Sequence, residues 1–293
     1  MSKIGFIGLG NMGTPMVLNL LKHQQQVIVF DIDPKNLKVV EKEGAMVADK
    51  VAAVCKDVDY IITMLPAGEH VKQVYYGAQG IFANAKPTTI LLECSTIDIE
   101  TSKALHNDAK KQSFTLFDAP VSGGTAGAKQ GTLTFMVGGD ESIFNKITTI
   151  LNYMGKNIFY AGEATAGQAA KICNNLMLAV HMIGTAEGLS LGKQLGLDMQ
   201  KLYDICNHAS GQNWSLSNYC PMPGIMPNVP SSNDFKPGFM GKMMLKDLKL
   251  AEDAAGSVDL DLPMLQKALA LYQQFCDDGH SEMDFSGIVM SLK

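Results

Sequence analysis

The first half of the chain alternates short apolar runs with segments of helical spacing. After the first apolar run, for example, Met16, Leu20 and Leu21 recur at the spacing of one helix face. The runs end at glycine, proline or polar residues, as buried strands do. Alternating strands and helices predict right-handed crossovers and a parallel sheet with helices on both faces. We predict central strands at 3–9, 26–30, 60–65, 89–94 and 115–118, and further strands at the sheet edge at 133–140 and 156–162.

The pattern changes near residue 164, where helical periodicity and Met-rich apolar faces replace β-branched clusters. A long helix is predicted from about 167 to 195, at the junction of two domains. Residues 218–239 carry five prolines and are expected to form a loop over a surface or a cleft. We therefore predict an α/β domain over residues 1–163 and an all-α substrate and oligomerisation domain over residues 164–293.

Composition narrows the class of partner. Hydrophobic residues make up 46% of the chain and charged residues 18%, which is typical of a globular protein. A net charge of -5 and the absence of a Lys/Arg-rich run argue against nucleic acid. Lys171 and Glu187 interrupt the most apolar helix, so we expect no membrane span. Six cysteines without a CxxC pair and an N-terminus without a signal-peptide pattern favour a cytoplasmic protein.

The most specific motif is Gly8-x-Gly10-x-x-Gly13, which follows a strand and opens a helix. In a Rossmann-type doubly wound sheet such glycines permit a tight turn, close approach of a pyrophosphate and close helix packing. Asp31 ends the next strand, where it can accept hydrogen bonds from the adenine ribose and repel a 2′-phosphate. The motif therefore predicts a dinucleotide site that prefers NAD to NADP.

Other strand ends add candidates. Pro66 and Ser95-Thr96 are either ordinary turns or ligand contacts, because ligands bind at the carboxyl ends of parallel strands. Ser122-Gly123-Gly124 follows a further strand, and its backbone N–H groups can form a concavity that suits a carboxylate or simply a tight turn.

Two polar residues on the long apolar helix are candidates for a catalytic function. Lys171 and Asn175 are one turn apart on one face. Burial would lower the pKa of a lysine from about 10.4 toward neutrality, which suits a general acid or base. The alternative is a lysine that reaches the solvent. Likewise, Lys246-Asp247 could belong to a solvated helix face. The six histidines show no metal-ligand spacing, and we predict no metal.

Four blocks together resemble the β-hydroxyacid dehydrogenase family: GLGNMGTPM at 8–16, DAPVSGG at 118–124, GQAAKICNN at 167–175 and KDLKLAEDA at 246–254. The resemblance implies Lys171 as catalytic acid/base and Asn175 as its partner. It implies substrate binding by Ser122, Gly123, Gly124, Trp214, Phe239 and Asp247, and cofactor binding by Gly8, Leu9, Gly10, Asn11, Met12, Gly13, Asp31, Leu65, Pro66, Thr96 and Lys246.

The implied activity is NAD-dependent oxidation of a small 3-hydroxy acid by a homodimer or homotetramer. Segments 213–235 and 279–286 are most similar to one branch of this family, whose substrate arises in amino-acid breakdown. Reduction of tartronate or succinate semialdehyde, which relatives perform, is an alternative. An alternative of another class is a non-catalytic NAD-binding scaffold protein, against which the presence of Lys171 argues.

Overall fold

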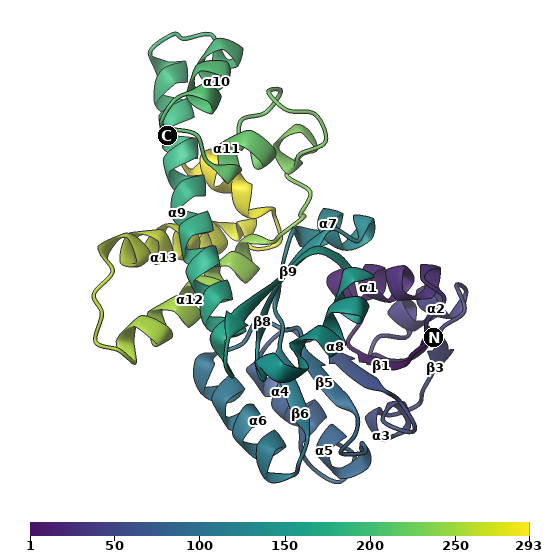
Figure 1. The fold of residues 1–293 in the computed structure, drawn as a ribbon. Helices are drawn as coiled ribbons and strands as arrows, with labels where there is room; N and C mark the ends of the chain where they lie inside the picture. The colour runs from purple at the N-terminus through teal and green to yellow at the C-terminus, as the bar shows by residue number, and fades with distance from the viewer. Residues whose placement is uncertain (293) are drawn as a thin grey trace. The chain divides into compact units, whose positions relative to one another are not determined.

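The computed structural model describes residues 1–292 and separates into two compact units, which divide between Lys171 and Ile172. The predicted domain limit between residues 163 and 164 comes shortly before this division and stays a prediction. The first unit contains all the strands of the described residues, and the second is built from helices (Figure 1).

The strands of the first unit form one sheet. They are β1 Lys3–Ile7, β2 Gln26–Phe30, β3 Met46–Val47, β4 Tyr60–Thr63, β5 Ile90–Glu93, β6 Thr115–Asp118, β7 Val121–Ser122, β8 Leu133–Gly138 and β9 Gly155–Gly162. Their order is β3-β2-β1-β4-β5-β6-β8-β7, with β9 paired to β8. The order reverses at β1, which is the switch point of a Rossmann-type sheet. The predicted fold class is confirmed.

The sheet is parallel from β3 across to β6, as predicted. Beyond β6 the direction changes, because β8, within the strand predicted at 133–140, runs antiparallel to β6 and β7. Antiparallel neighbours need no long crossover, and the short β7 pairs directly with β8. Strand β8 is not at the edge as predicted, because it pairs with β6 and β7 and also with β9, to which it runs parallel.

Helices cover both faces of this sheet. They are α1 Gly10–Lys22, α2 Pro34–Glu41, α3 Val51–Val54, α4 Gly68–Tyr75, α5 Ile81–Asn84, α6 Ile99–Lys111, α7 Gly124–Gln130 and α8 Glu141–Asn152. Phe6 and Ile62 pack in one core with residues of α1, α7 and α8. Their strand neighbours Ile7 and Ile61 pack in a second core with residues of α3 to α6. Successive strand residues thus serve opposite faces, which explains the continuous apolar runs.

The second unit is helical. Its elements are the long α9 Ala166–Gln194, which begins in the first unit, α10 Met199–His208, α11 Trp214–Tyr219, η1 Pro230–Ser232, α12 Gly241–Gly256, α13 Pro263–Phe275, η2 Cys276–His280 and η3 Phe285–Ser291. The proline-rich segment contains only the short η1 between α11 and α12, as its composition predicts. None of the helices in residues 1–292 has the length and apolar character that a bilayer span requires.

Candidate active site

The glycine motif forms a tight connection between β1 and α1. Gly8 has a φ of 89°, and a Cβ there would lie 2.4 Å from the Met64 carbonyl oxygen. A Cβ on Gly13 would lie 2.1 Å from the Gly8 carbonyl oxygen, so only glycine lets the helix approach the strand this closely. Helix α1 starts at Gly10, within the motif.

Gly10 differs from the other two glycines because a Cβ there would meet no atom within 4 Å. Its φ is 43°, and it opens α1, whose first N–H groups have no partner within the helix. An open backbone at a helix N-terminus suits a pyrophosphate. The residues present therefore fit a dinucleotide at this end of the sheet.

Asp31 holds the glycine connection from the neighbouring strand. Its Oδ2 accepts the Leu9 N–H at 2.6 Å, and its Oδ1 accepts the Asp33 N–H at 2.7 Å. The sequence did not predict that Asp31 stabilises the glycine connection by accepting these backbone hydrogen bonds. The predicted contact of Asp31 with a ribose uses the same carboxylate, and it stays a prediction.

Loops after β4 and β5 meet at the same edge. The Leu65 N–H donates to Ser95 Oγ at 2.8 Å, and the Ser95 N–H donates to Glu93 Oε1 at 2.8 Å. Thr63 Oγ1 donates to the other carboxylate oxygen, Glu93 Oε2. This network connects the predicted cofactor loops at 65–66 and 95–96. Glu93 was not among the predicted site residues, although an acid ending a buried apolar strand is a signal that could have found it.

Burial raises the pKa of the Glu93 carboxyl from 4.5 to about 7, although hydrogen bonds from Ser95 and Thr63 lower it. Glu93 is 1% exposed, and its register partner on β6 is Asp118, whose charge raises this pKa further. The folded chain therefore retains the Glu93 proton to a higher pH than the unfolded chain does.

We expect this buried acid to make stability depend on pH. Between pH 4.5 and about 7 the folded state binds more protons at Glu93 than the unfolded state, so stability falls as pH rises through this window. The loss attributable to Glu93 is up to about 3 kcal/mol. Denaturant unfolding at several pH values should show that Glu93→Gln lacks this loss. Parallel curves for variant and wild type would contradict the assignment, since other groups titrate in both.

Ser122, Gly123 and Gly124 do not form a simple turn. Ser122 ends β7, Gly123 has a φ of 129° and Gly124 begins α7. Gly123 is exposed, so its backbone is accessible to a ligand. The predicted carboxylate-binding role of the three residues is compatible with this exposure and stays a prediction.

The predicted catalytic helix is held at its first turn by Asp118. Asp118 Oδ2 accepts the Gln168 N–H at 2.8 Å, and Oδ1 accepts the Thr165 N–H at 2.9 Å. Lys171 is 7% exposed, so the alternative of a lysine that reaches the solvent is wrong. Asn175, one turn further, is 2% exposed.

Asn175 belongs to a polar cluster of the second unit. Its Nδ2 donates to Asp247 Oδ2 at 2.5 Å, and its Oδ1 accepts from Asn174. Lys246 Nζ lies 3.1 Å from Asp247 Oδ1. Asp247 is 3% exposed, so it does not belong to a solvated face as the alternative supposed. Helix α12 begins at Gly241, ahead of this pair.

Trp214 and Phe239 are connected through two other aromatic rings. Trp214 stacks on Tyr219, Tyr219 contacts Phe285, and Phe285 packs edge-on against Phe239. Asp284 accepts the Phe239 N–H and the Tyr219 hydroxyl. Asp284, which sequence reasoning had not singled out, thus holds Phe239 directly and Trp214 only through Tyr219. Their contact with substrate stays a prediction.

Comparison with known proteins shows to which family a chain with these features belongs. The profile of the NAD binding domain of 6-phosphogluconate dehydrogenase matches residues 3–162, and that of the NAD-binding domain of NADP-dependent 3-hydroxyisobutyrate dehydrogenase matches residues 165–292. Pseudomonas aeruginosa 3-hydroxyisobutyrate dehydrogenase is 44% identical over 290 residues, which cover 98% of this chain and 97% of that protein. The chain belongs to the 3-hydroxyisobutyrate dehydrogenase family.

Two further relatives bear on substrate. NAD-dependent L-serine dehydrogenase of Pseudomonas aeruginosa is 46% identical over 286 residues, covering 98% of this chain and 96% of that protein. A solved structure of Mycobacterium tuberculosis 3-hydroxyisobutyrate dehydrogenase with L-serine has a TM-score of 0.93 and 40% identity, covering 100% of this chain and 99% of that one. The family is thus certain, and the chain is an NAD-dependent hydroxyacid dehydrogenase.

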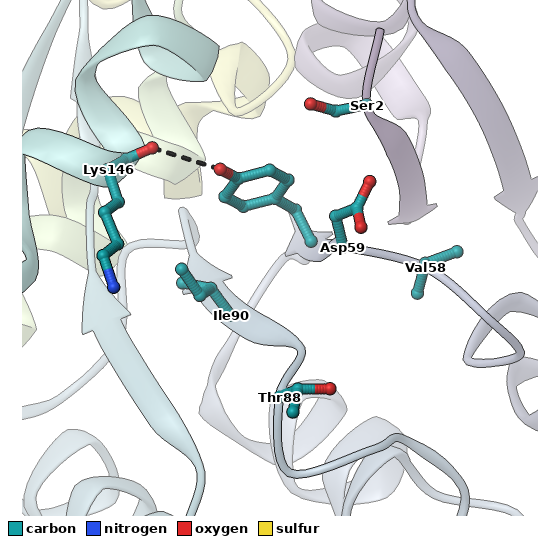
Figure 2. A pocket seen from close by; sticks show the side chains of 7 residues that line it. Ser2, Val58, Asp59, Thr88, Ile90 and Lys146 are labelled. Atoms are coloured by element: carbon teal, nitrogen blue, oxygen red, sulfur yellow. Dashed lines mark hydrogen bonds between the residues drawn. The ribbon is translucent and has the colours of Figure 1, made fainter.

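A hollow elsewhere in the first unit does not fit the cofactor of this 3-hydroxyisobutyrate dehydrogenase family. Figure 2 shows it beside Ser2, Asp59 and Lys146. The Tyr60 hydroxyl donates to the Lys146 carbonyl at 3.1 Å. Its volume is about 370 Å³. It lies where β1 and β4 begin, whereas ligands of open α/β sheets bind where strands end. No group of three metal-ligating side chains occurs in the part of the chain that the structure describes.

Proposed function

We propose that this chain oxidises 3-hydroxyisobutyrate to methylmalonate semialdehyde with NAD, a step of valine catabolism. The substrate is supported by the 44% identity with a 3-hydroxyisobutyrate dehydrogenase across nearly the whole of both chains. The reaction class is supported by one observation above the others: Lys171 is a buried lysine, 7% exposed, on the helix turn that Asp118 holds.

In the proposed reaction the Ser122, Gly123 and Gly124 backbone binds the substrate carboxylate. Neutral Lys171 accepts the proton of the substrate hydroxyl while the C–H bond of the carbinol carbon breaks and the carbonyl forms. Bound NAD supplies the acceptor for the hydride. Asn175 lies one helical turn from Lys171, and its hydrogen bond to Asp247 fixes its amide. Pro66, Thr96 and Lys246 are proposed cofactor contacts.

L-Serine is a second candidate substrate, favoured by the 46% identity with an L-serine dehydrogenase. Serine carries an ammonium group where 3-hydroxyisobutyrate carries a methyl group, so the two acids require opposite polarity in one part of the pocket. Rates of NADH formation with both acids decide between them. The panel should include glycerate, 3-hydroxypropionate and 4-hydroxybutyrate for the semialdehyde reductase alternatives, and threonine as control.

The highest kcat/KM with 3-hydroxyisobutyrate would support the proposal. If serine gives the highest value, the reaction class stands and the substrate changes. If none of the acids supports NADH formation, both proposed substrates are wrong.

Asp31 offers a test of cofactor preference. Asp31→Asn keeps an oxygen for the Leu9 N–H but removes the charge that repels a 2′-phosphate. We expect kcat/KM with NAD to fall about tenfold and that with NADP to rise, as the loss of a charged hydrogen bond costs about 1.5–3 kcal/mol. The control is Asp33→Asn, because Asp33 caps α2 through the Lys35 N–H. An equal change of preference in both variants would contradict the role of Asp31.

We further propose a cytoplasmic homodimer or homotetramer that pairs through the helical unit. Large apolar side chains of this unit are exposed, among them Leu191 at 61%, Leu195 at 70% and Ile205 at 64%. Exposed apolar surface of this kind is typical of interfaces. Light scattering of the purified chain measures the number of subunits.

A further inference from the structure

Gln168 makes two side-chain hydrogen bonds to one loop of the sheet. Its Nε2 donates to the Ser95 carbonyl oxygen at 2.7 Å, and its Oε1 accepts the Ile97 N–H at 3.1 Å. The residue is 0% exposed and lies in the first turn of α9. Its amide therefore bridges this turn to the loop that contains Thr96, and all of these residues lie in the first unit.

The backbone of the same residue is held from a different strand. The Gln168 N–H donates to Asp118, which ends β6 and is 1% exposed. Asp118 Oδ1 also lies 2.8 Å from His106 Nε2. A carboxylate at a helix N-terminus is favourable because the first N–H groups have no partner within the helix. The first turn of α9 is thus fixed from both β5 and β6.

The loop that Gln168 holds is fixed in turn by the strand-end network. Ser95 receives the Leu65 N–H and donates its own N–H to Glu93. One set of buried and partly buried hydrogen bonds therefore joins the predicted cofactor loops to the helix turn before Lys171. Residues three apart on a helix share one face, so the position of Gln168 determines that of the Lys171 backbone.

We propose that Gln168 is a positioning residue that keeps the Lys171 turn of α9 in register with the Ser95–Ile97 loop. This inference rests on the proposed function, in which Lys171 moves the proton and Thr96 contacts the cofactor. Proton and hydride transfer require reacting atoms in near-attack geometry, and a displacement of about 1 Å costs about 10²-fold in rate. Gln168 supplies the connection that limits such displacement.

Gln168→Met tests this role, because methionine has similar length and helix propensity but makes neither hydrogen bond. We expect kcat to fall about 10²-fold with little change in the KM for the acid. Deuterium at the carbinol carbon should give a larger isotope effect than in wild type, since chemistry becomes slower. The control is Gln274→Met, an exposed glutamine of α13 that bonds to Asp278. Wild-type kcat and isotope effect in Gln168→Met would overturn the proposal.

Gln168→Glu adds a readout that a purely structural role would not change. A protonated glutamate can replace the amide, because its O–H can donate to the Ser95 carbonyl while its other oxygen accepts the Ile97 N–H. Burial near Glu93 and Asp118 favours this protonated form. The imidazole of His106 lies 2.8 Å from Asp118 Oδ1 and is a further titratable group beside it. The ratio of Gln168→Glu to wild-type kcat should therefore rise as pH falls. A ratio independent of pH would contradict the proposal.

An activity-independent measurement separates this inference from the proposed function. In wild type, NADH should slow hydrogen exchange both in the 94–99 loop and in the 165–172 turn. In Gln168→Met the loop should be protected and the helix turn should not. Equal protection of the turn in both proteins would overturn the inference. If wild type turns over none of the acids, the proposed function is wrong. The exchange result then still tests the role of Gln168 independently.

Discussion

Replacing Lys171 with alanine is expected to lower kcat by about 10²- to 10⁴-fold, the usual contribution of a general acid or base. The dissociation constant for NADH should change little, because the residues predicted to bind the dinucleotide, the glycine connection and Asp31, do not lie on α9. Steady-state kinetics with the preferred acid and a fluorescence titration with NADH measure the two quantities.

The matched control for this variant is Lys193→Ala. Lys193 lies on the same helix but is exposed, so its removal should leave kcat unchanged. An active Lys171→Ala variant would eliminate Lys171 as the acid/base. A variant that loses NADH binding as well as activity would show that Lys171 maintains the cofactor site rather than moving a proton.

Gly13→Ala is expected to have the second large effect. The new Cβ would lie 2.1 Å from the Gly8 carbonyl oxygen, so β1 and α1 must separate. Overpacking of this kind costs about 1–3 kcal/mol of folding stability. The displaced turn should also weaken NADH binding more than tenfold, since a single charged hydrogen bond contributes about 1.5–3 kcal/mol.

Gly188→Ala provides the comparison, because Gly188 lies within α9 and a Cβ there would meet no atom within 4 Å. It should stabilise the chain by about 0.5–1 kcal/mol, as glycine is disfavoured inside helices. Thermal unfolding and NADH titration of both variants measure these effects. Unchanged NADH affinity in Gly13→Ala would show that the motif tolerates a wider turn and does not set cofactor binding.

The central sheet could be predicted because its strands are short apolar runs that end at turn residues. The runs 26–30 and 115–118 coincide with β2 and β6. Strands β3 and β7 could not be predicted, since each contains two residues and depends on pairing with a distant partner. The strand at 133–140 was predicted, but the antiparallel direction of β8 was not, because strand direction is decided by tertiary pairing.

Parts of the candidate site were predictable where the residue type itself indicates a conformation or a catalytic function. Glycines at positive φ and a lysine on an apolar helix are such residues. Gln168 was missed, because its role depends on backbone groups far along the chain, such as the Ile97 N–H. Sequence spacing indicates neighbours on one helix or strand, but it contains no distance between a helix turn and a strand-end loop.

Because α9 begins in one compact unit and continues into the other, exchange of domains between relatives has a preferred junction. A crossover near residue 163 would bring a foreign Thr165 and Gln168 to the Asp118 carboxylate and to the Ser95–Ile97 loop. A crossover after Lys171 would transfer the first helix turn together with the sheet that holds it. If this turn is kept with the nucleotide-binding half, helical units with other substrate preferences can be joined to it. The hydrogen bonds of the turn to the buried Asp118 carboxylate are then unchanged.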